Sequence, residues 1–143
     1  MKKRIFLLIL SVLLLTALAG CGGKTAEIPE NLTFSDVDFG KVNSMDLVNL
    51  TNGRETQTIY PDQLSKAADF LKNVTGTDPK PGKDCNCPIY SVTLKADFDT
   101  LLTLTFGENG ELSCCGACYT LTSPGTDEIT AFFSQFDAST QEN

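Results

Sequence analysis

The sequence contains no histidine and no tryptophan among its 143 residues. Histidine is the side chain that most often serves as a general base near neutral pH, and it is a frequent ligand of catalytic zinc. Its absence excludes Ser-His-Asp and Cys-His arrangements, so catalysis would have to use carboxylates, lysines or thiolates alone. We therefore predict a protein that is not an enzyme.

Positive charge is also scarce. The chain has 11 basic and 18 acidic residues, and three of the basic ones lie in residues 2–4. The 123 residues after residue 20 thus carry eight basic and 18 acidic groups, a net charge of −10, and they are enough for one domain with a modest core. Such an acidic surface repels phosphate backbones, so no nucleic-acid partner is expected.

A long apolar run occurs at the N-terminus, where residues 5–18 are apolar apart from Ser11 and Thr16. As a helix, these about 14 residues would span about 21 Å. A transmembrane helix needs about 20 apolar residues. Preceded by the cations of residues 2–4, the run predicts a signal peptide. It ends in Leu18-Ala19-Gly20-Cys21, a leucine and two small residues before a cysteine.

This tetrapeptide resembles the lipobox of bacterial lipoproteins. In that family the cysteine sulfur takes a diacylglyceryl group, and a signal peptidase then cuts just before the cysteine. The resemblance implies that Cys21 is lipidated and acylated, as with palmitate, and that the protein is extracytoplasmic and anchored to the cell membrane. Two or more acyl chains hold a protein to a membrane stably. We expect a signal peptide over 1–20 and a lipidated tether over 21–33.

The rest of the chain predicts a single α+β domain over 34–138, followed by a frayed tail over 139–143. Pro61 opens a helical apolar pattern over about 61–75, and a second one covers about 124–137 with Ser123 as its cap. Residues 77–84, rich in proline and glycine, are expected to form a loop. Strands are expected where apolar residues alternate or flank Asn-Gly turns, over 45–51, 54–60, 90–97, 102–106, 112–115 and 118–122.

This order of elements predicts an antiparallel sheet of about 4–6 strands with both helices packed on one face. The same order, behind a lipobox, resembles the small uncharacterised lipoproteins of Gram-positive bacteria. That resemblance implies a fold and a location at the cell membrane, and it includes no catalytic motif.

Five cysteines follow Cys21, spaced as C-x-C at residues 85–87 and as C-C-x-x-C at residues 114–118. The alternation along the strands predicts that four of them point outward on one side of the sheet: Cys85, Cys87, Cys115 and Cys118. A turn at Gly116-Ala117 would place Cys118 opposite Cys115. Cys114 is then expected to face the core and to be the thiol left over.

Three interpretations of the four-cysteine group remain open. Structural disulfides suit an exported domain, and bridges between the two groups, or Cys115–Cys118 across the turn, are favoured over a bridge within C-x-C. Four thiolates could instead bind zinc or another thiophilic metal, although no cofactor is required. Cys115-Gly-Ala-Cys118 superficially resembles a thiol-redox motif, but β-favouring residues follow it. All three require that the loop with Cys85 folds over the end of the sheet, or that the strand order differs from a simple meander, because strands two apart are separated by about 9.6 Å.

The leading hypothesis for function is a non-enzymatic, membrane-anchored module that binds another envelope protein or a ligand, or contributes to envelope structure. The alternative is a thiolate metal-binding or thiol-redox protein that uses Cys85, Cys87, Cys115 and Cys118.

Overall fold

The structure is a computed structural model that describes residues 27–52 and 55–137. The predicted signal peptide, the predicted lipidation site Cys21 and the tail 139–143 lie outside the described residues. Within the described part of the chain, no helix is both long enough and apolar enough to cross a membrane.

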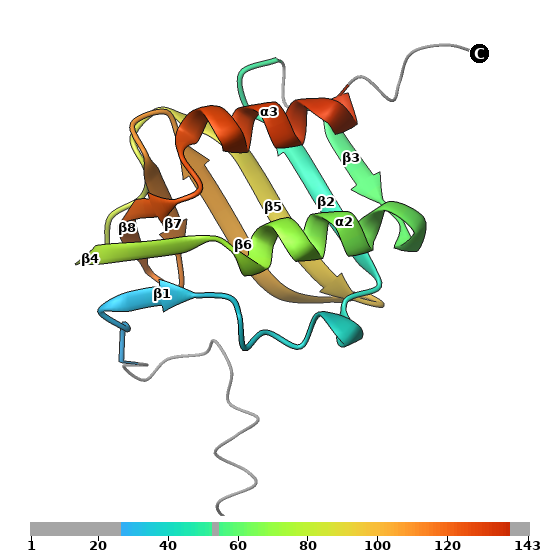
Figure 1. The fold of residues 1–143 in the computed structure, drawn as a ribbon, viewed down its shortest axis with the longest axis horizontal. Helices are drawn as coiled ribbons and strands as arrows, with labels where there is room; N and C mark the ends of the chain where they lie inside the picture. The colour runs from blue at the N-terminus through green and yellow to red at the C-terminus, as the bar shows by residue number, and fades with distance from the viewer. Residues whose placement is uncertain (1–26, 53–54, 138–143) are drawn as a thin grey trace, which may run out of the picture.

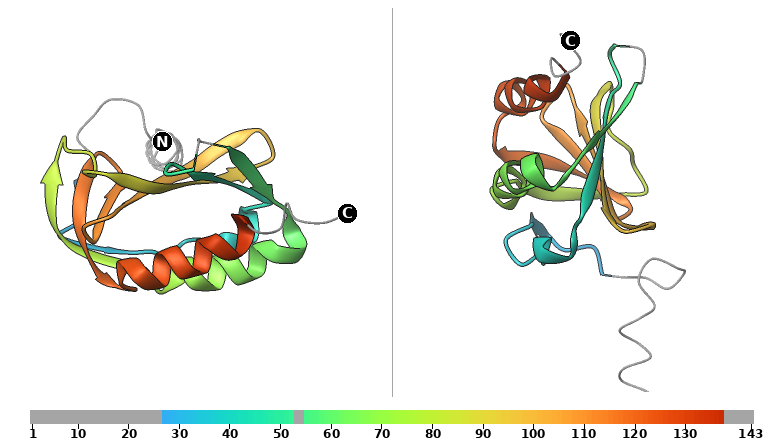
Figure 2. Two further views of the ribbon diagram at one scale, coloured as in Figure 1. Left: turned by 90° about the horizontal axis from the view of Figure 1, so that it is seen from above. Right: turned by 90° about the vertical axis from the view of Figure 1, so that its right-hand side faces the viewer.

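Among the described residues, eight strands form one antiparallel sheet, and two α-helices lie together on one of its faces (Figure 1, Figure 2). The elements are β1 (Asn31–Thr33), the 3-10 helix η1 (Phe39–Lys41), β2 (Ser44–Asn49), β3 (Thr56–Ile59), α2 (Pro61–Lys72), β4 (Thr75–Pro81), β5 (Pro88–Ala96), β6 (Asp99–Gly107), β7 (Glu111–Cys114), β8 (Ala117–Ser123) and α3 (Thr126–Asp137). The α+β class and the antiparallel sheet are confirmed.

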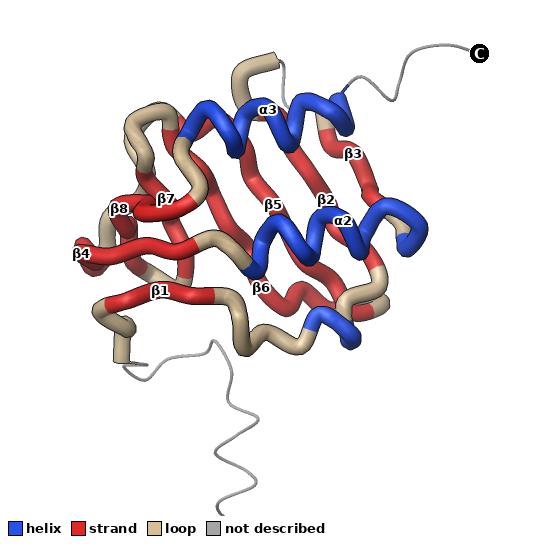
Figure 3. Tube along the Cα trace, in the orientation of Figure 1, coloured by secondary structure: helices blue, strands red, loops and turns tan. Residues whose placement is uncertain are grey.

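The predicted number of strands, 4–6, is wrong. The sheet has the order β1-β4-β8-β7-β6-β5-β2-β3 within the described residues. The two strands that sequence patterns did not indicate are β1, which lies in the expected tether, and β4, which lies mostly in the expected loop (Figure 3). They pair with each other, and β4 also pairs with β8. The sheet is therefore extended at this end by two strands that no sustained alternation of apolar and polar residues indicates.

Both helices form as predicted, but each is shorter than expected. Helix α2 begins at Pro61 and ends at Lys72 rather than at residue 75. Gly76, which we expected to end the helix, instead lies in β4, where a Cβ atom would stand 3.0 Å from Cβ of Tyr119. That glycine therefore permits close packing in the sheet.

Helix α3 begins at Thr126 rather than at residue 124. The carbonyl of Gly125 accepts a hydrogen bond from the backbone N–H of Ile129, at 3.0 Å. The Glu128 carboxylate accepts the Gly125 N–H at 2.9 Å. Gly125 therefore occupies the cap position of the helix, with its N–H satisfied by Glu128, and Ser123 is the last residue of β8.

The core lies between the helices and the face of the sheet that they cover. The predicted apolar stripe of α3 is buried, and it comprises Ile129, Phe132, Phe133 and Phe136. Phe133 is fully buried, and its ring centroid lies 5.4 Å from that of Tyr90 on β5 and 5.6 Å from that of Phe106 on β6. The opposite face of the sheet is not covered by the helices, and it can therefore carry polar residues and the segment that connects β4 to β5.

Candidate functional site

The candidate site is built by the segment 82–87, which connects β4 to β5. In the sheet these two strands are separated by β8, β7 and β6, so the connection has to cross those three strands. It crosses on the face away from the helices, because a Cβ atom on Gly107 would stand 2.9 Å from the Asn86 carbonyl oxygen. Gly107 alternates with Phe106, which faces the core.

The crossing segment brings Cys85 onto Cys118 of β8. The two sulfur atoms are 4.0 Å apart, and the Cys85 thiol donates a hydrogen bond to the Thr105 carbonyl oxygen at 3.1 Å. Cys85 is 9% exposed and Cys118 is 4% exposed. The requirement that the loop with Cys85 fold over the sheet is thus met.

Glu111 of β7 completes the group. One ligand atom from each of Cys85, Glu111 and Cys118 lies within 4.8 Å of the other two. Ser113 of β7 pairs with Cys118 of β8, and Glu111 precedes Ser113 by two residues in the same strand. The carboxylate and the Cys118 thiol therefore share the face of the sheet that the crossing segment covers.

Asn86 fixes the orientation of the Glu111 carboxylate. The Asn86 backbone N–H donates to Oε2 at 2.7 Å, and its side-chain Nδ2 donates to Oε1 at 3.2 Å. Each carboxylate oxygen has a second lone pair that stays available for another partner. The crossing segment thus supplies one sulfur ligand and also holds the oxygen ligand in place.

The reactivity of the Cys85 thiol is set mainly by burial. Burial, the neighbouring Cys118 thiol and the Glu111 charge together raise the pKa of Cys85 to about 12. The Cys85 thiol is therefore protonated at neutral pH and is a poor nucleophile. A cation placed among these three groups would lower this pKa again, because it would stabilise the thiolate.

The structure separates the four cysteines that the sequence grouped. Cys85 and Cys118 meet, whereas Cys87 and Cys115 are exposed and lie outside the group of close ligand atoms in the described residues. Cys85 lies on the face of the sheet away from the helices, but in the crossing segment rather than in a strand, and this segment buries its side chain. The hairpin turn is also one residue earlier than predicted, at Cys115-Gly116, since Cys114 pairs with Ala117. Glu111 was missed, because a lone glutamate in a strand gives no ligand signal.

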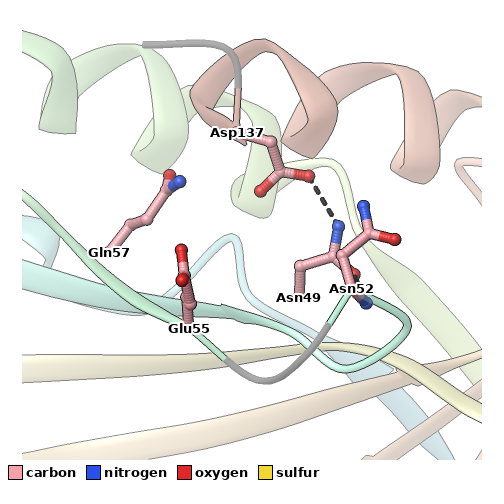
Figure 4. A pocket seen from close by; sticks show the side chains of 5 residues that line it. All are labelled: Asn49, Asn52, Glu55, Gln57 and Asp137. Carbon is pink, nitrogen blue, oxygen red and sulfur yellow. Dashed lines mark hydrogen bonds between the residues drawn. The ribbon is translucent and has the colours of Figure 1, made fainter. Parts of the chain in front are cut away.

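A second polar site lies where the end of α3 meets β2 (Figure 4). Its cavity of about 130 Å³ is lined by Asn49, Asn52, Glu55, Gln57 and Asp137. The Asp137 carboxylate accepts hydrogen bonds from Asn49 Nδ2 at 2.6 Å and from the Tyr90 hydroxyl at 3.0 Å. Burial and the contact with Asp137 together raise the pKa of Tyr90 to about 12. These contacts tie the last residue of α3 to the sheet, which indicates a structural role.

No family model, curated protein or solved structure matches this chain.

Proposed function

We propose that the protein is an exported lipoprotein, anchored to the cell membrane through lipid on Cys21, whose domain is a non-enzymatic module that binds a thiophilic divalent cation. Zinc is the cation that best suits two sulfur ligands and one carboxylate. The ligands are Cys85, Glu111 and Cys118, so the proposal keeps two of the four cysteines that the sequence suggested for a metal site.

The observation that carries the metal proposal is the distance of 4.0 Å between the sulfur atoms of Cys85 and Cys118. Two sulfurs at about 2.3 Å from a tetrahedral zinc ion stand about 3.8 Å apart. A disulfide needs about 2.05 Å between its sulfurs. The observed spacing is therefore close to that of a metal site, and three protein ligands leave the fourth position for water or a ligand.

The domain under reducing conditions, titrated with cadmium as a spectroscopic probe for zinc, is expected to bind about one equivalent with a thiolate-to-metal absorption band. Cys118→Ser should weaken binding by at least about 100-fold, because loss of a ligand exceeds the 10–100-fold effect of outer partners. Affinity should rise with pH by up to about tenfold per unit for each thiol proton displaced, since the raised pKa of Cys85 keeps that group protonated.

Cys87→Ser is the matched control, because Cys87 is exposed and outside the ligand group. It should bind cadmium as the unchanged protein does. An equal loss of affinity in Cys87→Ser and Cys118→Ser would contradict the proposed ligand set. A Cys85–Cys118 disulfide in protein isolated without reductant, with no bound metal, would replace the metal proposal by a structural bridge.

The anchoring proposal is tested separately on the full chain expressed in a bacterium fed labelled palmitate. The label should be incorporated into the unchanged chain and into Cys87→Ser, and it should be absent from Cys21→Ser, whose precursor should also keep residues 1–20. Label that persists in Cys21→Ser would show that the lipobox resemblance is misleading. The metal proposal would be unaffected by that outcome.

A further inference from the structure

A second pair of sulfurs lies at the tip of the β7–β8 hairpin, apart from the proposed metal ligands. Cys114 is the last residue of β7, and Cys115 with Gly116 forms the two-residue turn. Both turn residues have positive φ, 54° at Cys115 and 82° at Gly116. Such turns favour glycine, asparagine or aspartate at both positions, so cysteine is an unusual choice here.

The left-handed backbone at Cys115 has a direct consequence for its side chain. In a regular strand, adjacent side chains point to opposite faces of the sheet. Here the Sγ atoms of Cys114 and Cys115 are 2.9 Å apart. A disulfide between them would require the two sulfurs to move about 0.9 Å closer together. The sulfurs of Cys85 and Cys118 would have to move about 2 Å closer to form one.

The two sulfurs differ in access. Cys114 is 3% exposed, whereas Cys115 is exposed. Cys115 also lines a shallow cavity of about 280 Å³ together with Thr100, Leu101, Leu102 and Thr103. These residues belong to the half of β6 that has no pairing with β7, because β7 pairs only with residues 105–107. A small molecule can therefore reach one sulfur of the pair, while the other is shielded behind it.

The buried hydroxyl of Tyr119 is a further polar feature of this hairpin. Tyr119 is 1% exposed, and its hydroxyl has no hydrogen-bond partner among the described residues. A phenol hydroxyl can donate to a nearby acceptor, and a buried donor without a partner is uncommon in native structures.

We infer that Cys114 and Cys115 form a thiol–disulfide exchange site, which closes to a disulfide between adjacent residues by reaction with a low-molecular-weight disulfide that reaches Cys115 from the cavity beside β6. This inference is independent of the metal proposal, because it uses neither Cys85, Glu111 nor Cys118. It also differs from exchange at Cys115 and Cys118, since Cys118 is buried against Cys85.

The reaction balances in two steps. The Cys115 thiol loses its proton and attacks one sulfur of the small disulfide, whose S–S bond breaks; the leaving thiolate takes up a proton. The Cys114 thiol then loses its proton and attacks the Cys115 sulfur, which releases the second small thiolate to be protonated in turn. Two cysteine thiols are oxidised to one disulfide, and one small disulfide is reduced to two thiols.

The test exposes the reduced Cys87→Ser domain to oxidised glutathione, followed by acid quenching, alkylation and peptide mass mapping. The peptide with Cys114 and Cys115 is expected to become two hydrogens lighter and to carry no glutathione. In Cys114→Ala, which keeps the buried site apolar, glutathione should remain attached to Cys115. In Cys115→Ser, reaction at Cys114 should slow by at least about tenfold, because the buried sulfur is inaccessible.

Stable glutathione attachment to Cys115 in the presence of Cys114 would overturn the inference, and so would a disulfide that joins Cys115 to Cys118. The cavity is tested with Leu101→Asp, a change at a residue that is 46% exposed. The added negative charge should lower the rate at which Cys115 reacts with oxidised glutathione, which is anionic, by at least about threefold relative to its reaction with neutral hydroxyethyl disulfide. Equal slowing of both reagents, or of neither, would contradict docking in the cavity.

Discussion

Replacing Phe133 by alanine is expected to lower the free energy of unfolding by about 3–5 kcal/mol, the usual cost of truncating a buried aromatic side chain. The ring is fully buried, and its centroid lies 5.3 Å from that of Phe132 and 5.7 Å from that of Phe70 on α2. Tyr90 and Phe106 contact it from the sheet. The substitution therefore removes the group that joins both helices to the sheet, and the rigid aromatic neighbours cannot collapse fully into the cavity.

Urea unfolding measures this effect as a lower midpoint with an unchanged slope. Phe98→Ala is the matched control, because Phe98 is fully exposed in the turn between β5 and β6. The control should change stability by no more than about 0.5 kcal/mol. A loss at Phe133 no larger than that of the control would mean that α3 does not pack on the sheet as described.

The elements that the sequence predicted correctly are those with a clear apolar period. The stripe of α3 and the alternation of β5 each repeat often enough to specify a buried face. Strand β4 has no such repeat, because its seven residues include a glycine and two prolines. Its pairing with β8 shifts register between Thr77 and Lys80, where Asp78 adopts a positive φ. Such an irregular strand is held by its neighbours in the sheet, which a local pattern cannot show.

The candidate site was predictable only in part, for a similar reason. The sequence grouped Cys85 with Cys118, and the structure brings these two together. The predicted turn is one residue too late, because it consists of Gly116 and Ala117, whereas the turn in the structure consists of Cys115 and Gly116. Once the turn is placed at Cys115-Gly116, Cys118 pairs with Ser113, and Glu111 on the same face lies two residues from this partner instead of four residues from Cys115. The signal that could have indicated Glu111 as the third proposed ligand is a carboxylate two residues from the strand partner of a buried cysteine.

Gly107 makes the site possible, since it lies directly beneath the crossing segment. A Cβ atom at this position would stand 2.9 Å from the Asn86 carbonyl oxygen and 3.1 Å from Cβ of Cys85. Both neighbours belong to backbone or to the root of a side chain, so neither can rotate away. Gly107→Ala must therefore push the crossing segment off β6, at a cost of about 1–3 kcal/mol for overpacking. Alanine also lowers the conformational entropy of the unfolded chain, which stabilises the folded state by only about 0.4–1 kcal/mol. A net destabilisation is therefore expected.

The same displacement should weaken cadmium binding by at least about tenfold, because a metal site tolerates ligand distances only within about 0.2 Å. Gly40→Ala is the control: its nearest neighbour is the flexible Asp38 carboxylate, at 3.0 Å, and both residues are exposed. It should leave cadmium affinity unchanged and cost less than about 1 kcal/mol. If Gly107→Ala loses stability but keeps full affinity, the ligands move together and the spacing of Cys85 and Cys118 does not depend on β6. If it loses neither, the crossing segment does not rest on Gly107, and the geometry on which the proposed metal site depends is wrong.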